Sequence, residues 1–527
     1  MHVRDTNLAP LRTLVVALFG LTVLFHLGCA LAGRPIYRAS YLGTALEYSR
    51  SSIDLLRPVI VGFNANGTPT VQELPLWQAA AGMAFKITHS TWYGWANLVS
   101  LALFATCLWP LLQLARCYVE ERAAWWALAL FVTQPLIVLM AGEAGPDGFA
   151  LAVSIWFLYF ADRLVRENER WCWLPAAVFG SLAAVSKLPF FASAGMCSIF
   201  LLLLAGGRRW RTWVALASVG GVATVVFFVW TGYGERVAAQ AEYPYVELRL
   251  SKSEFMRYWY LGDLGYRLDP RHWIKGGWRF LHATLGTLPF IALLLPAFFR
   301  PGNRMPKLWL LATFITTLIF THVLLEHWHY YLMCCPPVAL LCGLTLARLE
   351  PVFSEQILVP FLRWGLAFLV LVFATVDGLV TMKVAINLDS YPREMSAIIH
   401  KHTLPDDKLV LYTSDLNWGG EELFTSDRRG LSVIALQSGL RSPSPKGLFD
   451  LLQNSADLSR LQELGFSKLV MISESPVRYV ARGSNPGSGK ARLKYPATIS
   501  PAVDAWPVVF QSEDILIKEI PKAPGNR

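Results

Sequence analysis

Long apolar runs alternate with short polar segments through residues 1–387. An apolar run of about 20 residues is long enough to cross about 30 Å of hydrocarbon as an α-helix. Eleven such runs lie at 11–32, 93–114, 123–141, 148–164, 171–186, 189–206, 212–232, 280–299, 307–326, 330–348 and 363–386. The pattern predicts a polytopic α-helical membrane protein with about eleven transmembrane helices.

The last part of the chain, residues 388–527, follows a different pattern. Short apolar runs predict strands, and two amphipathic stretches predict helices. The predicted strands are 407–414, 431–436, 468–473 and 508–520, and the predicted helices are 392–402 and 446–465. Alternation of helix and strand indicates a small soluble α/β domain. The chain therefore divides into a membrane part, 1–387, and a C-terminal domain, 388–527.

Two long loops, 33–92 and 233–279, interrupt the membrane part. Both contain amphipathic stretches with aromatic and basic residues, which are suited to the headgroup layer of a membrane. Long ordered loops are often functional. We therefore expect these two loops to contribute to a site.

Composition agrees with a membrane protein, since 54% of the residues are hydrophobic and 20 are Trp. The net charge of +10 could suggest nucleic acid as a partner. However, the Lys and Arg residues fall in alternate loops, which is the positive-inside pattern for a cytoplasmic N-terminus. We therefore expect no nucleic-acid binding, an uncleaved first helix, and a C-terminal domain outside the cytoplasm.

Ionisable residues at the ends of apolar runs nearly all fall on one predicted side of the membrane. They are Glu73, Glu143, Asp147, Lys187, Glu326, His327 and His329. Ionisable groups at membrane depth are costly and are functional candidates by default. Their shared side predicts a site at the outer membrane face.

Structural explanations compete with this interpretation. Glu73 precedes a predicted helix start, where a negative charge interacts favourably with the helix dipole. Asp147 suits a helix cap, and Lys187 could extend its side chain to the interface. Glu143 and Asp147 share one short turn, where their repulsion would favour a counter-cation such as Lys187 or a metal.

The segment around residues 325–337 is a candidate metal site. Glu326 adjoins a His-x-His motif formed by His327 and His329, followed by Tyr330. Two imidazoles and a carboxylate can bind a divalent metal ion. Alternatively, His and Tyr at a membrane boundary are ordinary interface residues.

Five short motifs occur in an order that resembles a known family. They are Tyr37-Arg38, Glu73-Leu74-Pro75-Leu76-Trp77, Pro146-Asp147, Lys187-Leu188-Pro189 and His329-Tyr330-Tyr331. Through these motifs and their order, the chain resembles bacterial membrane glycosyltransferases of the GT-C fold. The similar branch contains the protein O-mannosyltransferases and the lipid A aminoarabinose transferases.

This resemblance implies an inverting glycosyltransferase in the bacterial inner membrane, with a periplasmic C-terminal domain. The donor would be a sugar on a polyprenyl phosphate, and the acceptor a glycolipid, a polysaccharide or a protein. It implies that Arg38 and Lys187 bind the donor phosphate and that Glu73 and Asp147 are catalytic. Because the Glu73 position belongs to a metal-binding pair in the aminoarabinose transferases, Glu73 could hold a divalent ion with a His.

Further candidates for substrate or metal contacts are Glu143, Glu326, His327, His329 and Tyr330. One departure stands out: many relatives have an acidic residue early in the first outer loop, whereas residues 35–40 contain none. Glu73 or Asp147 could take its role, the acceptor could be activated differently, or transferase activity could be lost.

Two other functions remain open. A transporter or flippase of lipid-linked saccharides would also need a polar cavity, but it would favour charges nearer mid-membrane and internal symmetry. A non-catalytic membrane scaffold would use the C-terminal domain as a binding module.

Overall fold

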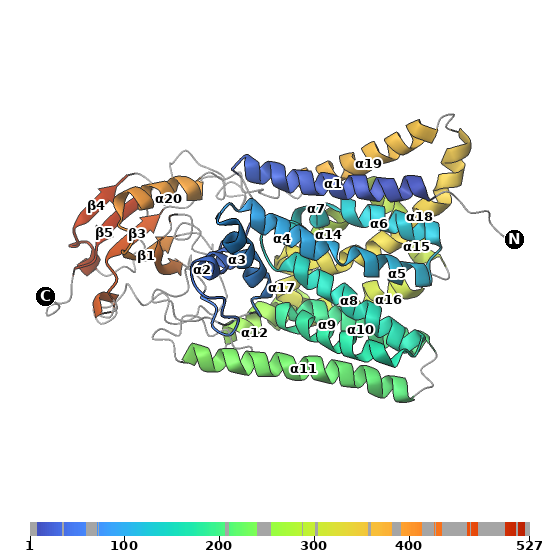
Figure 1. Ribbon diagram of the computed structural model, residues 1–527, viewed down its shortest axis with the longest axis horizontal. Helices are drawn as coiled ribbons and strands as arrows, with labels where there is room; N and C mark the ends of the chain where they lie inside the picture. The colour runs from blue at the N-terminus through green and yellow to red at the C-terminus, as the bar shows by residue number, and fades with distance from the viewer. Residues whose placement is uncertain are drawn as a thin grey trace.

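The protein has a long helical bundle with a β-sheet beyond one end of it, as the computed structural model shows (Figure 1). The structure describes residues 8–33, 36–59, 71, 73–205, 210–239, 254–286, 288–300, 304–356, 360–381, 391–413, 426, 428–434, 461–463, 465–472, 501–512 and 515–521. The short helices α2 (Ala39–Arg50) and α3 (Leu76–Thr88) lie between the bundle and the sheet.

Helices occupy all eleven ranges predicted to cross the membrane, some of them as two consecutive pieces. They are α1 (Ala9–Leu31), α4 (Gly94–Ala105) with α5 (Leu108–Tyr118), α6 (Glu121–Thr133) with α7 (Pro135–Met140), α8 (Asp147–Arg166), α9 (Trp173–Ser186) after η1 (Arg170–Cys172), α10 (Leu188–Leu204), α11 (Trp210–Ala239), α14 (Pro270–Thr284) with α15 (Leu288–Phe299), α16 (Arg304–Ile319) with α17 (Thr321–Glu326), α18 (Cys335–Gln356) after η2 (Trp328–Cys334), and α19 (Pro360–Thr381). Two further helices of the second long loop are α12 (Glu254–Leu261) and α13 (Leu264–Leu268).

Within the described residues, five helical segments are both long and apolar enough to cross a membrane. They are Ala9–Leu31, Gly94–Tyr118, Asp147–Arg166, Trp210–Val237 and Trp328–Leu349. Leu188–Leu204 and Ala367–Val380 are apolar but shorter. A polytopic helical membrane protein is therefore the architecture, and the count of eleven crossings stays a prediction.

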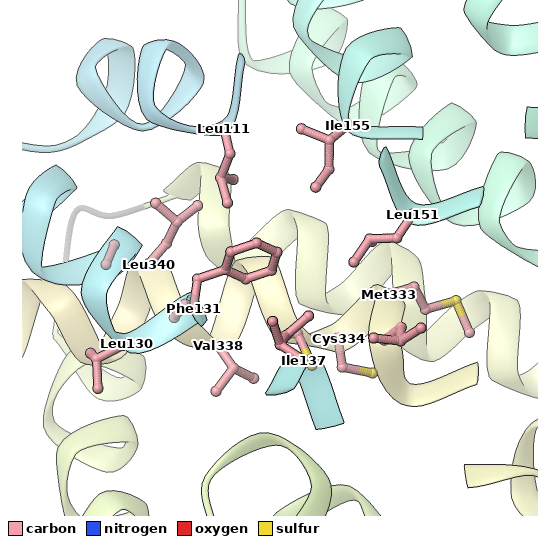
Figure 2. Close-up of a cluster of buried hydrophobic side chains, with 14 of the residues drawn as sticks. Leu111, Leu130, Phe131, Ile137, Leu151, Ile155, Met333, Cys334, Val338 and Leu340 are labelled. Atoms are coloured by element: carbon pink, nitrogen blue, oxygen red, sulfur yellow. The ribbon is translucent and has the colours of Figure 1, made fainter. Parts of the chain in front are cut away.

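The bundle core is built from apolar side chains on α6, α7, α8, η2 and α18. Figure 2 shows Phe131 and Ile137 facing Leu151, Met333 and Val338, and all five are buried. Close packing of this kind holds membrane helices together, because lipid is as apolar as the side chains and association depends on van der Waals contact.

Small residues let α6 and α18 approach one another closely. A Cβ atom added to Gly343 of α18 would lie 2.6 Å from the amide nitrogen of Ala127 and 2.8 Å from the carbonyl oxygen of Ala123. Both contacts are with backbone atoms of α6, which cannot move aside as a flexible side chain can. The absence of a side chain at Gly343 is therefore required by this helix pair.

The C-terminal part contains a five-stranded mixed sheet in the order β2-β1-β3-β5-β4. The strands are β1 (Lys408–Thr413), β2 (Arg429–Ile434), β3 (Lys468–Ile472), β4 (Val508–Gln511) and β5 (Ile515–Glu519). β1 is parallel to β2 and β3, whereas β5 is antiparallel to β3 and β4. Helix α20 (Tyr391–His402) contributes Met395 and Ile399 to the core of this sheet.

One strand prediction in this region is wrong. The segment 508–520 was expected to be a single strand, but it is the hairpin of β4 and β5. The amide of Ser512 donates to the carbonyl oxygen of Ile515 at 2.8 Å, which closes the turn. The predicted helix 446–465 lies mostly outside the described residues, of which 461–463 are helical.

Replacing Gly343 by Ala is expected to destabilise the protein by about 1–3 kcal/mol, because overpacking forces two backbones apart. Gly195→Ala in α10 is the matched control, since nothing lies within 4 Å of its added Cβ. The control should be neutral or slightly stabilising, because Ala favours a helix over Gly by about 0.5–1 kcal/mol. Thermal unfolding midpoints of the purified variants would measure both effects, and equal midpoints would contradict the packing argument.

Candidate functional site

Five charged side chains from separate segments meet around the first residue of α8. Arg38 immediately precedes α2, Glu73 lies shortly before α3, and Lys187 joins α9 to α10. Asp147 begins α8, and Glu143 lies in the loop between α7 and α8. The four residues expected from the sequence to bind phosphate or act in catalysis are therefore brought together, and Glu143 joins them.

Asp147 lies at the centre of this network and is completely buried. Its Oδ2 atom is 2.7 Å from Nη1 of Arg38, and its Oδ1 atom is 3.6 Å from Nζ of Lys187. Each cation also contacts a second carboxylate: Nε of Arg38 is 3.2 Å from Oε2 of Glu143, and Nζ of Lys187 is 2.5 Å from Oε1 of Glu73. A buried carboxylate keeps its charge only with such partners.

Pro189 explains how Lys187 and Glu73 come together. Proline has no amide hydrogen, so α9 cannot continue through residue 189, and Lys187 takes an extended conformation. The carbonyl oxygen of Val185, which an amide at position 189 would have bonded, instead accepts from the amide of Leu74 at 3.0 Å. The segment that carries Glu73 is thereby tied to the end of α9, next to Lys187.

A short parallel bridge aligns Arg38 with the loop that carries Glu143. The amide of Arg38 donates to the carbonyl oxygen of Ala144 at 3.2 Å, and the amide of Ala144 donates to that of Ile36 at 2.9 Å. Because the two backbones run side by side here, the Arg38 guanidinium can span both Glu143 and Asp147.

Helix α4 braces this bridge through two buried polar side chains that the sequence analysis did not single out. The Asn97 amide donates to the carbonyl oxygens of Ile36 at 2.7 Å and of Gly142 at 2.6 Å. The Ser100 hydroxyl donates to the carbonyl oxygen of Glu143 at 2.7 Å. Asn97 and Ser100 are three residues apart in an apolar run, so they lie on one face of the helix. This spacing was the sequence signal that could have identified them.

Aromatic rings form another wall of the site. The rings of Tyr41 and Tyr330 both lie 5.6 Å from Nζ of Lys187, within the range of a cation–π interaction, and Lys187 also donates to the Tyr41 hydroxyl at 3.2 Å. The His329 ring packs on Tyr330 at 4.5 Å, and His327 lies 5.5 Å from His329. Tyr330, His327 and His329 thus extend from the charged network, while Tyr41 is a contact the sequence did not predict.

Glu326 does not join this site, and its predicted metal cluster with His327 and His329 is not formed. Its carboxylate accepts from the Tyr266 hydroxyl at 2.8 Å and from Lys275 at 2.9 Å. The Glu326 carboxylate therefore bonds to residues of helices α13 and α14 and not to the charged network.

The contacts of Glu73 favour an ion pair over a metal ligand. Its carboxylate lies against the Lys187 ammonium group, which competes with a metal cation for the same oxygen. In the part of the chain that the structure describes, no three His, Cys, Asp or Glu side chains gather in a way that could hold a metal ion. The donor set therefore fits an internal ion-pair network better than a metal centre.

The electrostatic balance of the network is uneven, because three carboxylates share two cations. Burial raises the pKa of Glu143 to about 7, with Arg38 opposing the shift and Asp147 adding to it. Burial also raises the pKa of Glu73, although Lys187 opposes that shift. For Lys187 the neighbouring carboxylates outweigh burial, so its pKa lies well above its usual value and it remains charged.

No family model and no curated protein matches the sequence, but two solved structures are similar to this protein in fold. The crystal structure of ArnT from Cupriavidus metallidurans bound to undecaprenyl phosphate is similar at a TM-score of 0.59 and 16% identity, covering 97% of this chain and 99% of that chain. The apo structure of the same ArnT gives 0.57 and 15%, over 96% and 98%. The match extends over nearly all of both chains, so the resemblance predicted from the sequence is confirmed at the level of fold: this protein has the GT-C fold.

Proposed function

We propose that the protein is an inverting glycosyltransferase that moves a sugar from a polyprenyl-phosphate donor to an acceptor hydroxyl. The acceptor class is a glycolipid, a polysaccharide or a protein. The reaction takes place at the periplasmic face of a bacterial inner membrane, with the N-terminus in the cytoplasm and eleven crossings. The observation that carries the proposal is the convergence of Arg38 and Lys187 with three carboxylates in a GT-C fold.

The two cations suit the leaving group. When the bond between the sugar carbon and the phosphate oxygen breaks, the polyprenyl phosphate gains negative charge, and fixed cations stabilise that charge. Arg38 and Lys187 are held in place by Asp147 before any substrate arrives, so they need little reorganisation. Asp147 itself is fully buried, which favours a positioning role for it rather than direct contact with substrate.

The acceptor must lose a proton as its oxygen attacks the sugar from the face opposite the phosphate. A carboxylate near the attacking oxygen can take that proton. Glu73 is the better candidate than Asp147, because its side chain retains 21% exposure whereas Asp147 has none. Burial raises the pKa of Glu73, which makes it a stronger base than an exposed glutamate.

The primary test is incubation of the purified protein with a panel of polyprenyl-phosphate sugars and candidate acceptors. Release of free polyprenyl phosphate with formation of a glycosylated acceptor is the expected result. A flippase would instead move the intact donor across a vesicle membrane without release, and a scaffold would do neither.

Asp147→Asn is expected to lower turnover at least about 100-fold, because Arg38 and Lys187 would lose the charge that holds them. Asp162→Asn is the matched control. Asp162 is equally buried on the same helix α8, and it is paired with Arg166 at 3.3 Å near the opposite end. Both changes disturb a buried ion pair, so both should lower the thermal unfolding midpoint. Only Asp147→Asn should strongly reduce the rate of sugar transfer. Equal loss of transfer in the two variants would indicate a stability effect alone.

Asn97→Leu tests whether the α4 brace pre-organises the site. The change leaves the carbonyl oxygens of Ile36 and Gly142 without their donor while keeping every ionisable group. A shift of about 1 Å in a catalytic group can cost about 100-fold in rate, so we expect turnover to fall about 10- to 100-fold. Gln134→Leu is the control, since this buried amide bonds the carbonyl oxygen of Cys335, outside the charged network. If Gln134→Leu reduces transfer as strongly at equal folded yield, the brace has no specific role.

A further inference from the structure

The charged network carries one surplus negative charge when all five groups are ionised. Arg38 and Lys187 contribute two positive charges, and Glu73, Glu143 and Asp147 contribute three negative ones. Water and salt screen such an imbalance poorly in a buried site. One carboxylate must therefore hold its charge with weaker compensation than the other two.

The contacts identify Glu143 as that carboxylate. Asp147 has a cation at each oxygen, and Glu73 lies 2.5 Å from the Lys187 ammonium. Among the described residues, the ion pair of Glu143 is with Arg38 alone, at 3.2 Å, and the same guanidinium holds Asp147 more closely, at 2.7 Å. The Glu143 side chain is only 10% exposed, so solvent compensates little.

The groups around Glu143 come from several elements. Arg38 immediately precedes α2, Asp147 begins α8, and Lys187 lies at the corner between α9 and α10. His26 of α1 packs its ring against Gly142, next in the chain, and Nε2 of that ring lies 2.8 Å from the carbonyl oxygen of Val138. His327, which immediately precedes η2, and His329 of η2 both interact electrostatically with Arg38.

We propose that Glu143 takes up one proton when a phosphodiester anion binds between Arg38 and Lys187, so that donor binding is coupled to protonation of this site. The inference rests on the proposed function, because it assumes that these two cations receive the donor phosphate. In the free protein, Arg38 compensates both Glu143 and Asp147. The bound anion also interacts with Arg38 and so weakens that compensation. The least compensated carboxylate then becomes neutral, and the network regains its former net charge.

The sign of the resulting pH dependence follows from linkage. In the free protein, burial raises the pKa of Glu143 to about 7, and a nearby anion raises that pKa further. Between the two pKa values the complex holds a proton that the free protein lacks, so affinity rises as pH falls, by up to about tenfold per pH unit. Below the lower pKa, Glu143 is protonated in both states, and affinity no longer depends on pH.

The test uses a short-chain prenyl methyl phosphodiester as the probe. Its single charge does not titrate near neutrality, in contrast to a phosphate monoester, whose second pKa is about 6. Calorimetric binding in buffers of different ionisation enthalpy, at neutral and mildly alkaline pH, measures the protons taken up. The wild-type protein is expected to take up about half a proton per anion bound at neutral pH, where Glu143 is already partly protonated, and close to one proton at mildly alkaline pH. Glu143→Gln should take up almost none, and its affinity should no longer fall with rising pH.

Glu326→Gln is the matched control, because Glu326 is a paired carboxylate outside the network, and it should retain the proton uptake of the wild type. Undiminished uptake in Glu143→Gln, or none in a wild-type protein that binds the probe, would overturn the inference while leaving the proposed function intact. Failure of the wild type both to bind the probe and to release polyprenyl phosphate from any donor would overturn the proposed function, and the inference with it.

Discussion

The charged network at this end of the bundle is built around the buried carboxylate of Asp147. A carboxylate with no solvent exposure needs partners, and it has two, Arg38 and Lys187, which arrive from different parts of the chain. Each of those cations brings a further carboxylate, Glu143 or Glu73. The need of the buried Asp147 carboxylate for cationic partners therefore brings the first long loop, the α7–α8 loop and the α9–α10 corner into one network.

Backbone contacts hold the segments of that network together. Pro189 interrupts a helix and thereby frees the carbonyl oxygen of Val185 for Leu74, while Asn97 bonds the two strands of backbone that carry Arg38 and Glu143. The charged groups are thus held in place by backbone groups and by one uncharged side chain. The two cations are therefore held in position by contacts within the protein itself.

The path of the backbone explains why Glu326, His327 and His329 do not form the predicted metal cluster among the described residues. Adjacent positions in sequence suggested that Glu326, His327 and His329 act together as metal ligands. The chain ends a helix at Glu326 and takes an extended conformation at His327, so the carboxylate turns toward Lys275 and Tyr266, while the imidazoles continue toward Tyr330. Sequence neighbours share a site only when the backbone between them keeps their side chains on one face.

Hydrophobic periodicity determined the helical membrane architecture. Charges at the ends of apolar runs made Glu73, Glu143, Asp147 and Lys187 candidates, because desolvation makes a charge at those positions improbable without a role, whereas Arg38 was predicted only through the family resemblance. Only the tertiary structure decided which carboxylate pairs with which cation, that Glu326 belongs elsewhere, and that Asn97, Ser100 and Tyr41 support the site. Pairing depends on distances of a few ångströms between segments far apart in the chain, and neither composition nor local spacing contains those distances.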